Sequence, residues 1–344
     1  MSDGVWPLPL SLALFALAVA IVVVFGVMMT RVASQLAERT GLGEAMMGAF
    51  FLGASTSLPE IATSVTAAVG GHADLALSNA IGSVAGQTAF LAIADMAYRR
   101  VNLEHAAASA ENLMLAAFVL VMLAIPLLGM ALPQAAIGGI HPVSILMMAA
   151  YIQGMRMVSQ THKLPMWLPR HTGETRTAVT GEAQAKDAGL PRLWLQFVLA
   201  ASMTGIAGWL LARTAIPIAD RTGLSETIVG GILTGLAGSM PELITAVAAV
   251  RMGALTLAVG DVLGGNAFDA LIVAFVDWGF PGESVFAAAG AEQVFLLALA
   301  VLLTSILLMG MLYREKHGIA NIGLESFLVL ILYVGAFMLL FMLG

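Results

Sequence analysis

Cysteine is absent from this 344-residue chain, and charged residues are scarce. Asp, Glu, Lys and Arg make up 10% of the residues against 60% apolar ones, whereas soluble domains carry about 25% charged residues. The absence of cysteine excludes disulfide scaffolds, thiolate zinc sites and cysteine nucleophiles. The scarcity of charge excludes a soluble globular protein, a disordered chain and a nucleic-acid binder, which needs a basic face. The composition therefore indicates a protein of the lipid bilayer.

Long apolar runs take the place of charge along the whole chain. A spanning helix needs about 20 mostly apolar residues, and the runs show no period-2 alternation that would indicate a barrel. We therefore expect an all-α membrane protein with ten transmembrane helices, at residues 6–29, 43–68, 74–96, 111–131, 136–157, 192–212, 224–250, 254–277, 289–313 and 321–343.

One long polar stretch, residues 158–191, separates five apolar segments from the next five and predicts a linker. If the N-terminus lies outside, all 15 basic residues except Arg213 and Arg221 fall on the side of this linker. Because basic loops stay in the cytoplasm, we expect a cytoplasmic linker in a multi-pass protein of the cell (inner) membrane.

The two halves of the chain repeat each other at a constant offset of 182 residues. AERTGLGE at 37–44 matches ADRTGLSE at 219–226, and GAFFLGASTSLPEIATSVTAAVGG at 48–71 matches GGILTGLAGSMPELITAVAAVRMG at 230–253. We therefore predict two five-helix repeats, residues 1–157 and 192–344, whose best-matched parts span about 37–96 and 219–278. Five is an odd number, so the repeats enter the membrane with opposite orientations. Inverted repeats with a site near the midplane are typical of secondary transporters.

Each repeat places a proline and a glutamate in the middle of an apolar segment, as Pro59-Glu60 and Pro241-Glu242. Proline breaks a helix, and the freed carbonyls must be paired or line a wet cavity. A charge at the bilayer centre costs at least about 2.5 kcal/mol, and no Lys or Arg stands at a comparable depth. A bound cation is then the expected partner. The alternative is that both glutamates are protonated and hydrogen-bonded across the bundle.

Two more polar residues, Gln87 and Asp269, each stand 27 positions after the glutamate of their repeat. Both fall in mid-span and can complete a shell of oxygen ligands. Asp269 is favoured as a ligand, whereas for Gln87 ligation and simple packing are equally open. Oxygen ligands without imidazole or sulfur favour calcium or sodium over zinc or copper.

These paired motifs resemble the alpha repeats of the calcium/cation antiporter superfamily, which includes the sodium/calcium exchangers. The resemblance implies a sodium/calcium exchanger-like fold and exchange of calcium for sodium, or in some branches for protons, by alternating access. It implies small inorganic cations as cargo, no enzymatic activity, no permanently bound cofactor and no obligatory protein partner. The cation-site residues that it implies are Glu60, Glu242, Asp269, Thr56, Ser57, Ser239 and Ser83.

The chain departs from the pattern of that superfamily at several positions. Gly238, Gly265, Val84 and Gln87 stand where Thr, Ser, Asn and Asn are usual, and Asp261 stands where Asn is usual. The site thus has fewer neutral oxygens and one possible additional acid. Proton coupling, or transport of another cation, is therefore an alternative to sodium/calcium exchange; a passive cation channel and an intramembrane enzyme are more remote alternatives.

Overall fold

The protein is described here from a computed structural model, in which residues 6–40, 54–97, 102–163, 189–314 and 323–343 are described. These residues are almost wholly helical. The long elements are α1 (Leu8–Ile21), continued by η1 (Val22–Gly26) and α2 (Val27–Thr40), then α4 (Leu58–Val69), α5 (Ala73–Ala97), α7 (Ala110–Ala131), α8 (Pro142–Lys163), α9 (Leu190–Thr222), α12 (Met240–Arg251), α13 (Leu255–Gly279), α15 (Ala291–Tyr313) and α16 (Leu324–Leu343). Shorter pieces are α6 (Leu103–Ala107), η3 (Pro133–Ala135), α10 (Glu226–Ile228), η4 (Val229–Thr234), α11 (Gly235–Gly238) and α14 (Val285–Ala288).

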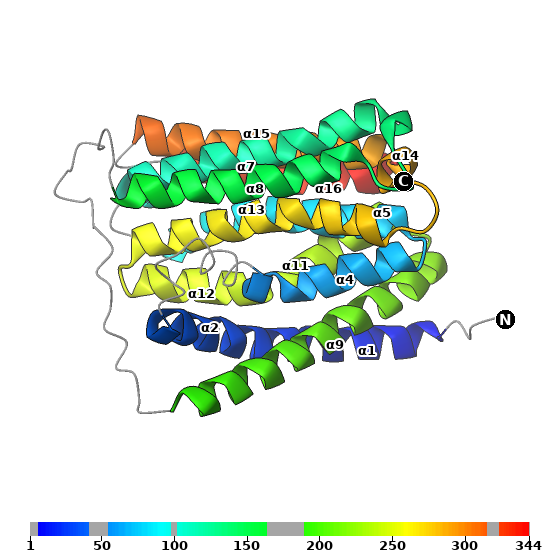
Figure 1. Ribbon diagram of the computed structural model, residues 1–344, viewed down its shortest axis with the longest axis horizontal. Helices are drawn as coiled ribbons and strands as arrows, with labels where there is room; N and C mark the ends of the chain where they lie inside the picture. The colour runs from blue at the N-terminus through cyan, green and yellow to red at the C-terminus, as the bar shows by residue number, and fades with distance from the viewer. Residues whose placement is uncertain (1–5, 41–53, 98–101, 164–188, 315–322, 344) are drawn as a thin grey trace.

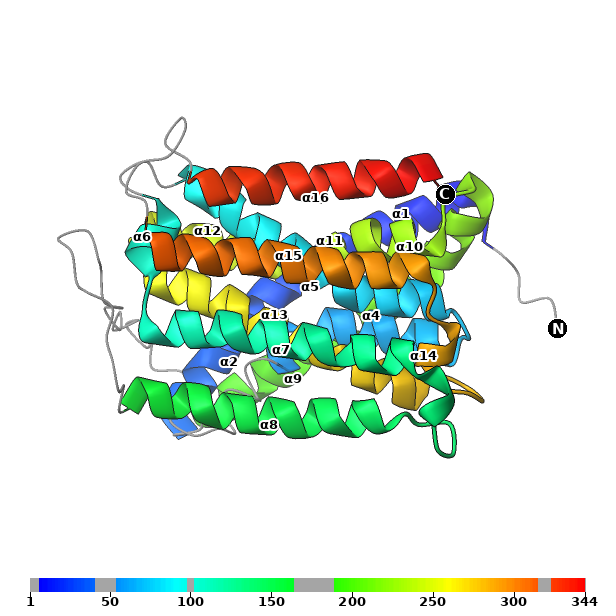
Figure 2. The same cartoon turned by 90° about the horizontal axis from the view of Figure 1, so that it is seen from above.

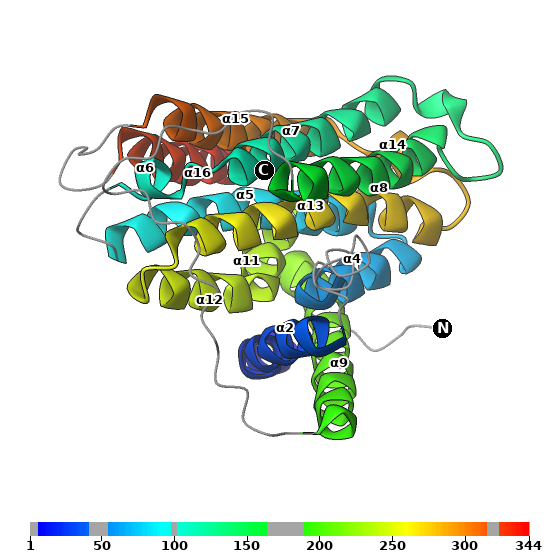
Figure 3. The same cartoon turned by 60° about the vertical axis from the view of Figure 1, so that its left-hand side comes forward.

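The long helices lie side by side along the long axis of the molecule (Figure 1). The start of α1 and the end of α16 share one end of the bundle, while the end of α8 and the start of α9 lie at the other, which we call the linker end. Figure 3 shows α5 and α13 in the middle, with α2 and α9 on one side and α7, α8, α15 and α16 on the other. The elements α4, α11 and α12 lie between the central pair and α2 with α9.

The central helix α5 is the least apolar of the spanning helices but the most buried. In the most apolar 18-residue stretch of this helix 94% of the residues are buried, against 22% in the first and in the last span. Its polar side chains therefore face other helices instead of lipid. A bilayer protein keeps such groups only where they are paired or line a site, so the centre of the bundle is where a site is expected.

Seven described helices are long and apolar enough to cross a membrane, and eight if the bent pair that joins α10–α11 to α12 counts as one span. The expected span at 43–68 is represented by α4, which is 12 residues long, because residues 43–53 lie outside the described part. The 22-residue helix α8 is not among the seven, since its second half carries Gln153, Arg156 and Gln160. The all-helical membrane fold is confirmed, and the count of ten spans stays a prediction.

Helix bounds in the two halves agree with the 182-residue offset. Helix α4 covers 58–69 and α12 covers 240–251, while α5 covers 73–97 and α13 covers 255–279. In Figure 1 the members of each pair run in opposite directions along the bundle. The division of the chain into two repeats is itself still a prediction.

Two glycines allow a long helix to cross a proline-containing helix closely. A Cβ atom at Gly208 of α9 would lie 2.5 Å from the carbonyl oxygen of Pro59, and one at Gly26 of η1 would lie 2.4 Å from Cγ of Pro241. Thr63 adds a hydrogen bond from its hydroxyl to the Gly208 carbonyl at 3.0 Å. Any side chain at either glycine would push the helices apart.

We predict that Gly208→Ala destabilises the protein, because the added methyl group meets backbone that cannot rotate away. Overpacking of this kind costs about 1–3 kcal/mol. The matched control is Gly205→Ala on the same helix, where a Cβ would have no neighbour within 4 Å. The midpoint of thermal unfolding in detergent should fall for Gly208→Ala and stay at the wild-type value for Gly205→Ala. Equal midpoints for the two variants would contradict the packing argument.

Candidate functional site

The site is built on two matching helix breaks. Ser57 precedes α4 with φ −85° and ψ 14°, and Ser239 precedes α12 with φ −87° and ψ 9°. At the second break the helix axis bends by 47°. After each serine a proline sits in the first turn of the new helix, where its missing N–H costs nothing.

Each break also places a glutamate in the first turn of the new helix, Glu60 in α4 and Glu242 in α12. The N-terminal end of a helix carries partial positive charge that favours a carboxylate. Both side chains are buried, at 0% and 5% exposed. The predicted helix breaks and buried glutamates are thus present in the described structure.

A chain of hydrogen bonds joins side chains from both halves. The amide nitrogen of Gln87 donates to Asp269 Oδ2 at 2.6 Å and to Ser239 Oγ at 3.1 Å. Ser239 in turn donates to Glu60 Oε1 at 2.8 Å, and Ser83 donates to Asp269 Oδ2 at 3.0 Å. Five of the predicted residues therefore meet at one place, between α4, α5, α13 and the break before α12.

Buried oxygen atoms without hydrogen-bond partners gather around this chain. They are six atoms from five side chains, namely Ser57 Oγ, Glu60 Oε2, Gln87 Oε1, both carboxylate oxygens of Glu242 and Asp269 Oδ1. Unpaired buried acceptors are costly, and calcium takes about 6–8 oxygen ligands in proteins. Among the described residues the one ion pair is His72–Glu226, so no basic side chain in that part neutralises these carboxylates.

The three carboxylates do not converge on a single point. Within the described ranges no group of three or more His, Asp or Glu side chains is placed to hold a metal ion. A cation bound here would depend on neutral oxygens of Ser57, Ser239 and Gln87 and on carbonyls at the breaks, together with a shift of the acidic side chains.

Two of the unusual glycines make room for this arrangement. A Cβ atom at Gly238 would lie 2.9 Å from Glu60 Oε1, and one at Gly265 would lie 3.1 Å from Gln87 Oε1. Oxygen atoms of the first half therefore fill the space that hydroxyl side chains of the second half would occupy.

Some predicted residues lie less centrally. Thr56 is half-buried just before the first break, and Val84 is buried. Asp261 was expected as a possible buried acid; solvent reaches its side chain, unlike those of Glu60, Glu242 and Asp269. It lies close enough to Glu242 to interact electrostatically, so it is an additional, solvent-accessible acid near the site.

Sequence reasoning missed the side chain that ties the first broken helix to its neighbour. The amide of Asn79 on α5 donates to Ser64 Oγ at 2.8 Å and to the backbone oxygen of Glu60 at 3.4 Å. The counterparts at the 182-residue offset are Asp261 and Ala246, which cannot make the same bond. The available signal was a mid-span Asn on the same helix as Ser83 and Gln87.

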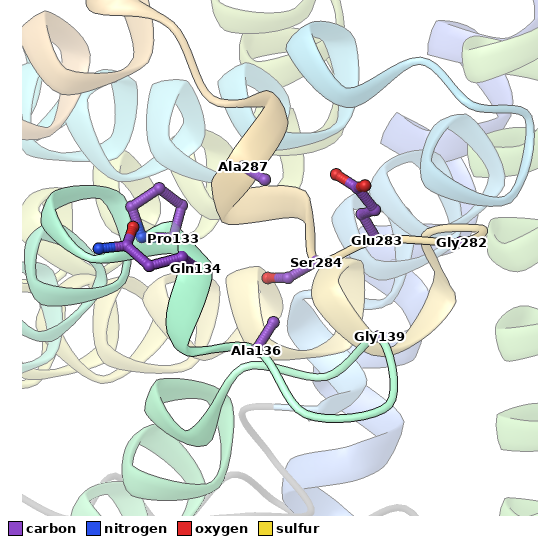
Figure 4. Close-up of a pocket in the computed structure, with 8 residues that line it drawn as sticks. All are labelled: Pro133, Gln134, Ala136, Gly139, Gly282, Glu283, Ser284 and Ala287. Atoms are coloured by element: carbon purple, nitrogen blue, oxygen red, sulfur yellow. The ribbon is translucent and has the colours of Figure 1, made fainter.

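A surface pocket of about 480 Å³ lies away from these residues, among the loops around η3 and before α14 (Figure 4). Its lining includes Gln134, Ser284 and one charged residue, Glu283, and none of the site carboxylates. The pocket therefore lies apart from the candidate cation site.

Comparison with known proteins decides the family. Residues 10–156 and 192–343 match the family described as "Sodium/calcium exchanger protein". The chain belongs to this sodium/calcium exchanger family. The sequence-based resemblance is therefore confirmed at the level of the family.

Individual family members are related over most of their length. The chain is 28% identical over 337 residues to the putative antiporter CaxA of Alkalimonas amylolytica, covering 90% of this chain and 92% of that one. It is 27% identical over 265 residues to the inner membrane protein YrbG of Escherichia coli (strain K12), covering 77% and 78%. The crystal structure of the H+/Ca2+ exchanger CAX is similar with a TM-score of 0.66 at 14% identity, covering 97% of this chain and 85% of that one. This structural likeness supports the fold.

We predict that Gly238→Ala weakens calcium binding by about tenfold or more, since its methyl group would displace the Glu60 carboxylate and overpacking costs about 1–3 kcal/mol. Gly264→Ala is the matched control, because a Cβ there has no neighbour within 4 Å. Calcium binding to the purified variants, measured by isothermal titration calorimetry, should fall only for Gly238→Ala. Unchanged affinity in that variant would separate Glu60 from the binding site.

Proposed function

We propose that this family member is a secondary active antiporter that exchanges calcium for sodium across the membrane by alternating access. The observation that carries the proposal is the group of six buried, unpaired oxygens at the two helix breaks and on α5 and α13 beside them. A small hard cation is the partner that satisfies such a group. The family, described as sodium/calcium exchanger proteins, supports this choice.

Competition for shared carboxylates couples the two ions in this mechanism. Calcium binds through Glu60, Glu242 and Asp269, with Ser57, Ser239, Ser83 and Gln87 as neutral partners and Thr56 at the edge. The sodium ions use the same oxygens, so calcium must leave before they bind. An empty, charged site is costly to carry through the bilayer, which disfavours the change of access without a bound ion.

The crossings at Gly26 and Gly208 are where movement can change access. At each crossing a glycine of the long helix lies directly against the proline of a broken helix. Small residues at a crossing reduce the interlocking of side chains, which favours sliding of one helix along another. We infer that α1–α2 and α9 move against the breaks and open the site to one side at a time.

Proton coupling is the second candidate, favoured by the missing hydroxyls. Gly238 and Gly265 provide no side-chain oxygen, and the Gln87 amide already engages Asp269 Oδ2. Fewer neutral oxygens support fewer sodium sites, whereas a carboxylate can carry a proton by itself. Calcium/proton exchange would use the same residues.

The proposed topology follows from the loop charges. The N-terminus lies outside and residues 158–191 lie in the cytoplasm of a multi-pass protein in the inner membrane, where the related YrbG is named as resident. The lipid bilayer and small inorganic cations are its partners, and no cofactor is bound permanently.

The coupling ion is tested by calcium-45 uptake into proteoliposomes with a sodium gradient and a pH gradient imposed separately. We expect the sodium gradient to drive uptake above the calcium equilibrium. Uptake driven by pH alone would replace sodium by protons in the proposal. Calcium flux without any counter-ion, at channel-like rates, would overturn antiport altogether.

We also predict that Glu60→Gln and Glu242→Gln each reduce calcium exchange to background, because each removes a negative charge from the site. Glu283→Gln, at an exposed position in the surface pocket, is the charge-matched control and should exchange at the wild-type rate. Size-exclusion chromatography verifies folding before flux is measured. Retained exchange in either site variant would remove that glutamate from the proposal.

A further inference from the structure

A cluster of hydrogen bonds links the start of α16 to α5 and α6 at the linker end. Asp95 of α5 accepts from the backbone N–H of Leu103 at 2.8 Å and of Gly323 at 3.0 Å. Glu104 of α6 accepts through Oε1 from the hydroxyl of Ser326 on α16. Figure 2 shows α6 at this end of the bundle, beside the region where α16 begins.

The opposite end of the bundle carries a counterpart of this hydrogen-bond cluster, formed by residues 182 positions later or earlier in the chain. Asp277 accepts from the backbone N–H of Val285 at 3.1 Å and of His141 at 2.8 Å, and from the hydroxyl of Ser144 at 2.6 Å. The position that corresponds to Glu104 is Phe286, which is buried and packs against Gly129. An apolar side chain at this position is therefore sufficient for such a hydrogen-bond cluster. The presence of a carboxyl group at Glu104 needs another explanation.

The Glu104 side chain is 3% exposed, and its Oε2 atom has no hydrogen-bond partner. A Cβ atom built on Gly323 would lie 2.9 Å from this Oε2 and 3.3 Å from Oε2 of Glu325. The two glutamates thus converge above Gly323, and Asp95 stands beside them. Three carboxylates from three helices share this small volume.

The basic groups of the described residues near these acids are His105 and Arg314. Each bonds the other's backbone, through His105 Nδ1 to Arg314 O at 2.7 Å and Arg314 Nη2 to His105 O at 3.4 Å. Burial, and next the charge of Asp95, raise the pKa of Glu104 from 4.5 to about 7. The neutral carboxyl is therefore favoured while α16 is docked.

We propose that Glu104 is a proton-binding site that latches the start of α16 onto α6. The neutral carboxyl keeps its bond with Ser326 and can donate through Oε2 to Glu325. When the O–H bond breaks and the proton leaves to water, three negative charges face one another and the contact loosens. The latch is separate from the cation site and does not depend on which ions the protein exchanges.

The sign of the pH effect follows from the two protonation states. A docked Glu104 holds its proton up to about pH 7, whereas a released one loses it near its ordinary value of 4.5. Docking is therefore strongest below pH 4.5, weakens as pH rises to about 7, and levels off above that. Each unit between the two pKa values corresponds to a tenfold change in the docking equilibrium.

Hydrogen exchange measured by mass spectrometry tests the latch on the full chain in detergent. The reporters are the amides of Gly323, bonded to Asp95, and of Phe327, bonded to the Gly323 carbonyl at 3.0 Å. After correction for intrinsic exchange, we expect their protection to drop at least about tenfold between pH 5.5 and 8. Protection that is equal at the two pH values would overturn the proposal.

Two variants assign the effect to this carboxyl. Glu104→Gln stays neutral, and Glu104→Phe copies the counterpart Phe286, so both should keep high protection at pH 8. Glu292→Gln, at the other end of the bundle, should respond to pH like the wild type. A drop of wild-type size in either Glu104 variant would overturn the proposal, and having two replacements keeps the test open if one of them does not fold.

Discussion

Carboxylates without a basic partner in the middle of the bundle are the constraint on which this structure depends. Glu60, Glu242 and Asp269 are buried at a depth where an unpaired charge is expensive. Helix breaks bring backbone dipoles and hydroxyls to them, and small residues allow the helices to approach closely enough to exclude lipid. The surrounding helices can then be plainly apolar, because they only separate this polar centre from the bilayer.

The contact between Gln87 and Asp269 shows how the two halves meet. These residues are counterparts at the 182-residue offset, and they bond directly to each other at 2.6 Å. Two equivalent positions can touch only where a pseudo-twofold axis passes between them. The axis of the proposed inverted repeat therefore runs between α5 and α13 at this bond, and in the proposed mechanism each half contributes ligands to the same ion.

The repeat, the breaks and the buried glutamates could be predicted from sequence because they depend on local chemistry. Proline breaks a helix wherever it stands in mid-span, and a constant offset locates the second copy. The crossings at Gly26 and Gly208 could not be predicted, since a glycine in an apolar helix does not reveal which helix it faces. The solvent access of Asp261 was missed for the same reason: residue type and depth do not determine which side chains of α13 solvent can reach.

The bond from Asn79 to Ser64 has a consequence for the resting protein. In the proposed cycle the two broken helices exchange roles between the outward-open and inward-open states. The first break is fastened to α5 by this bond, and the second carries Asp261 and Ala246 in the corresponding positions. A neutral hydrogen bond contributes about 0.5–1.5 kcal/mol, which is a roughly two- to tenfold difference between two populations. In the proposed cycle this difference biases the empty carrier toward one side of the membrane, before any ion gradient acts on it.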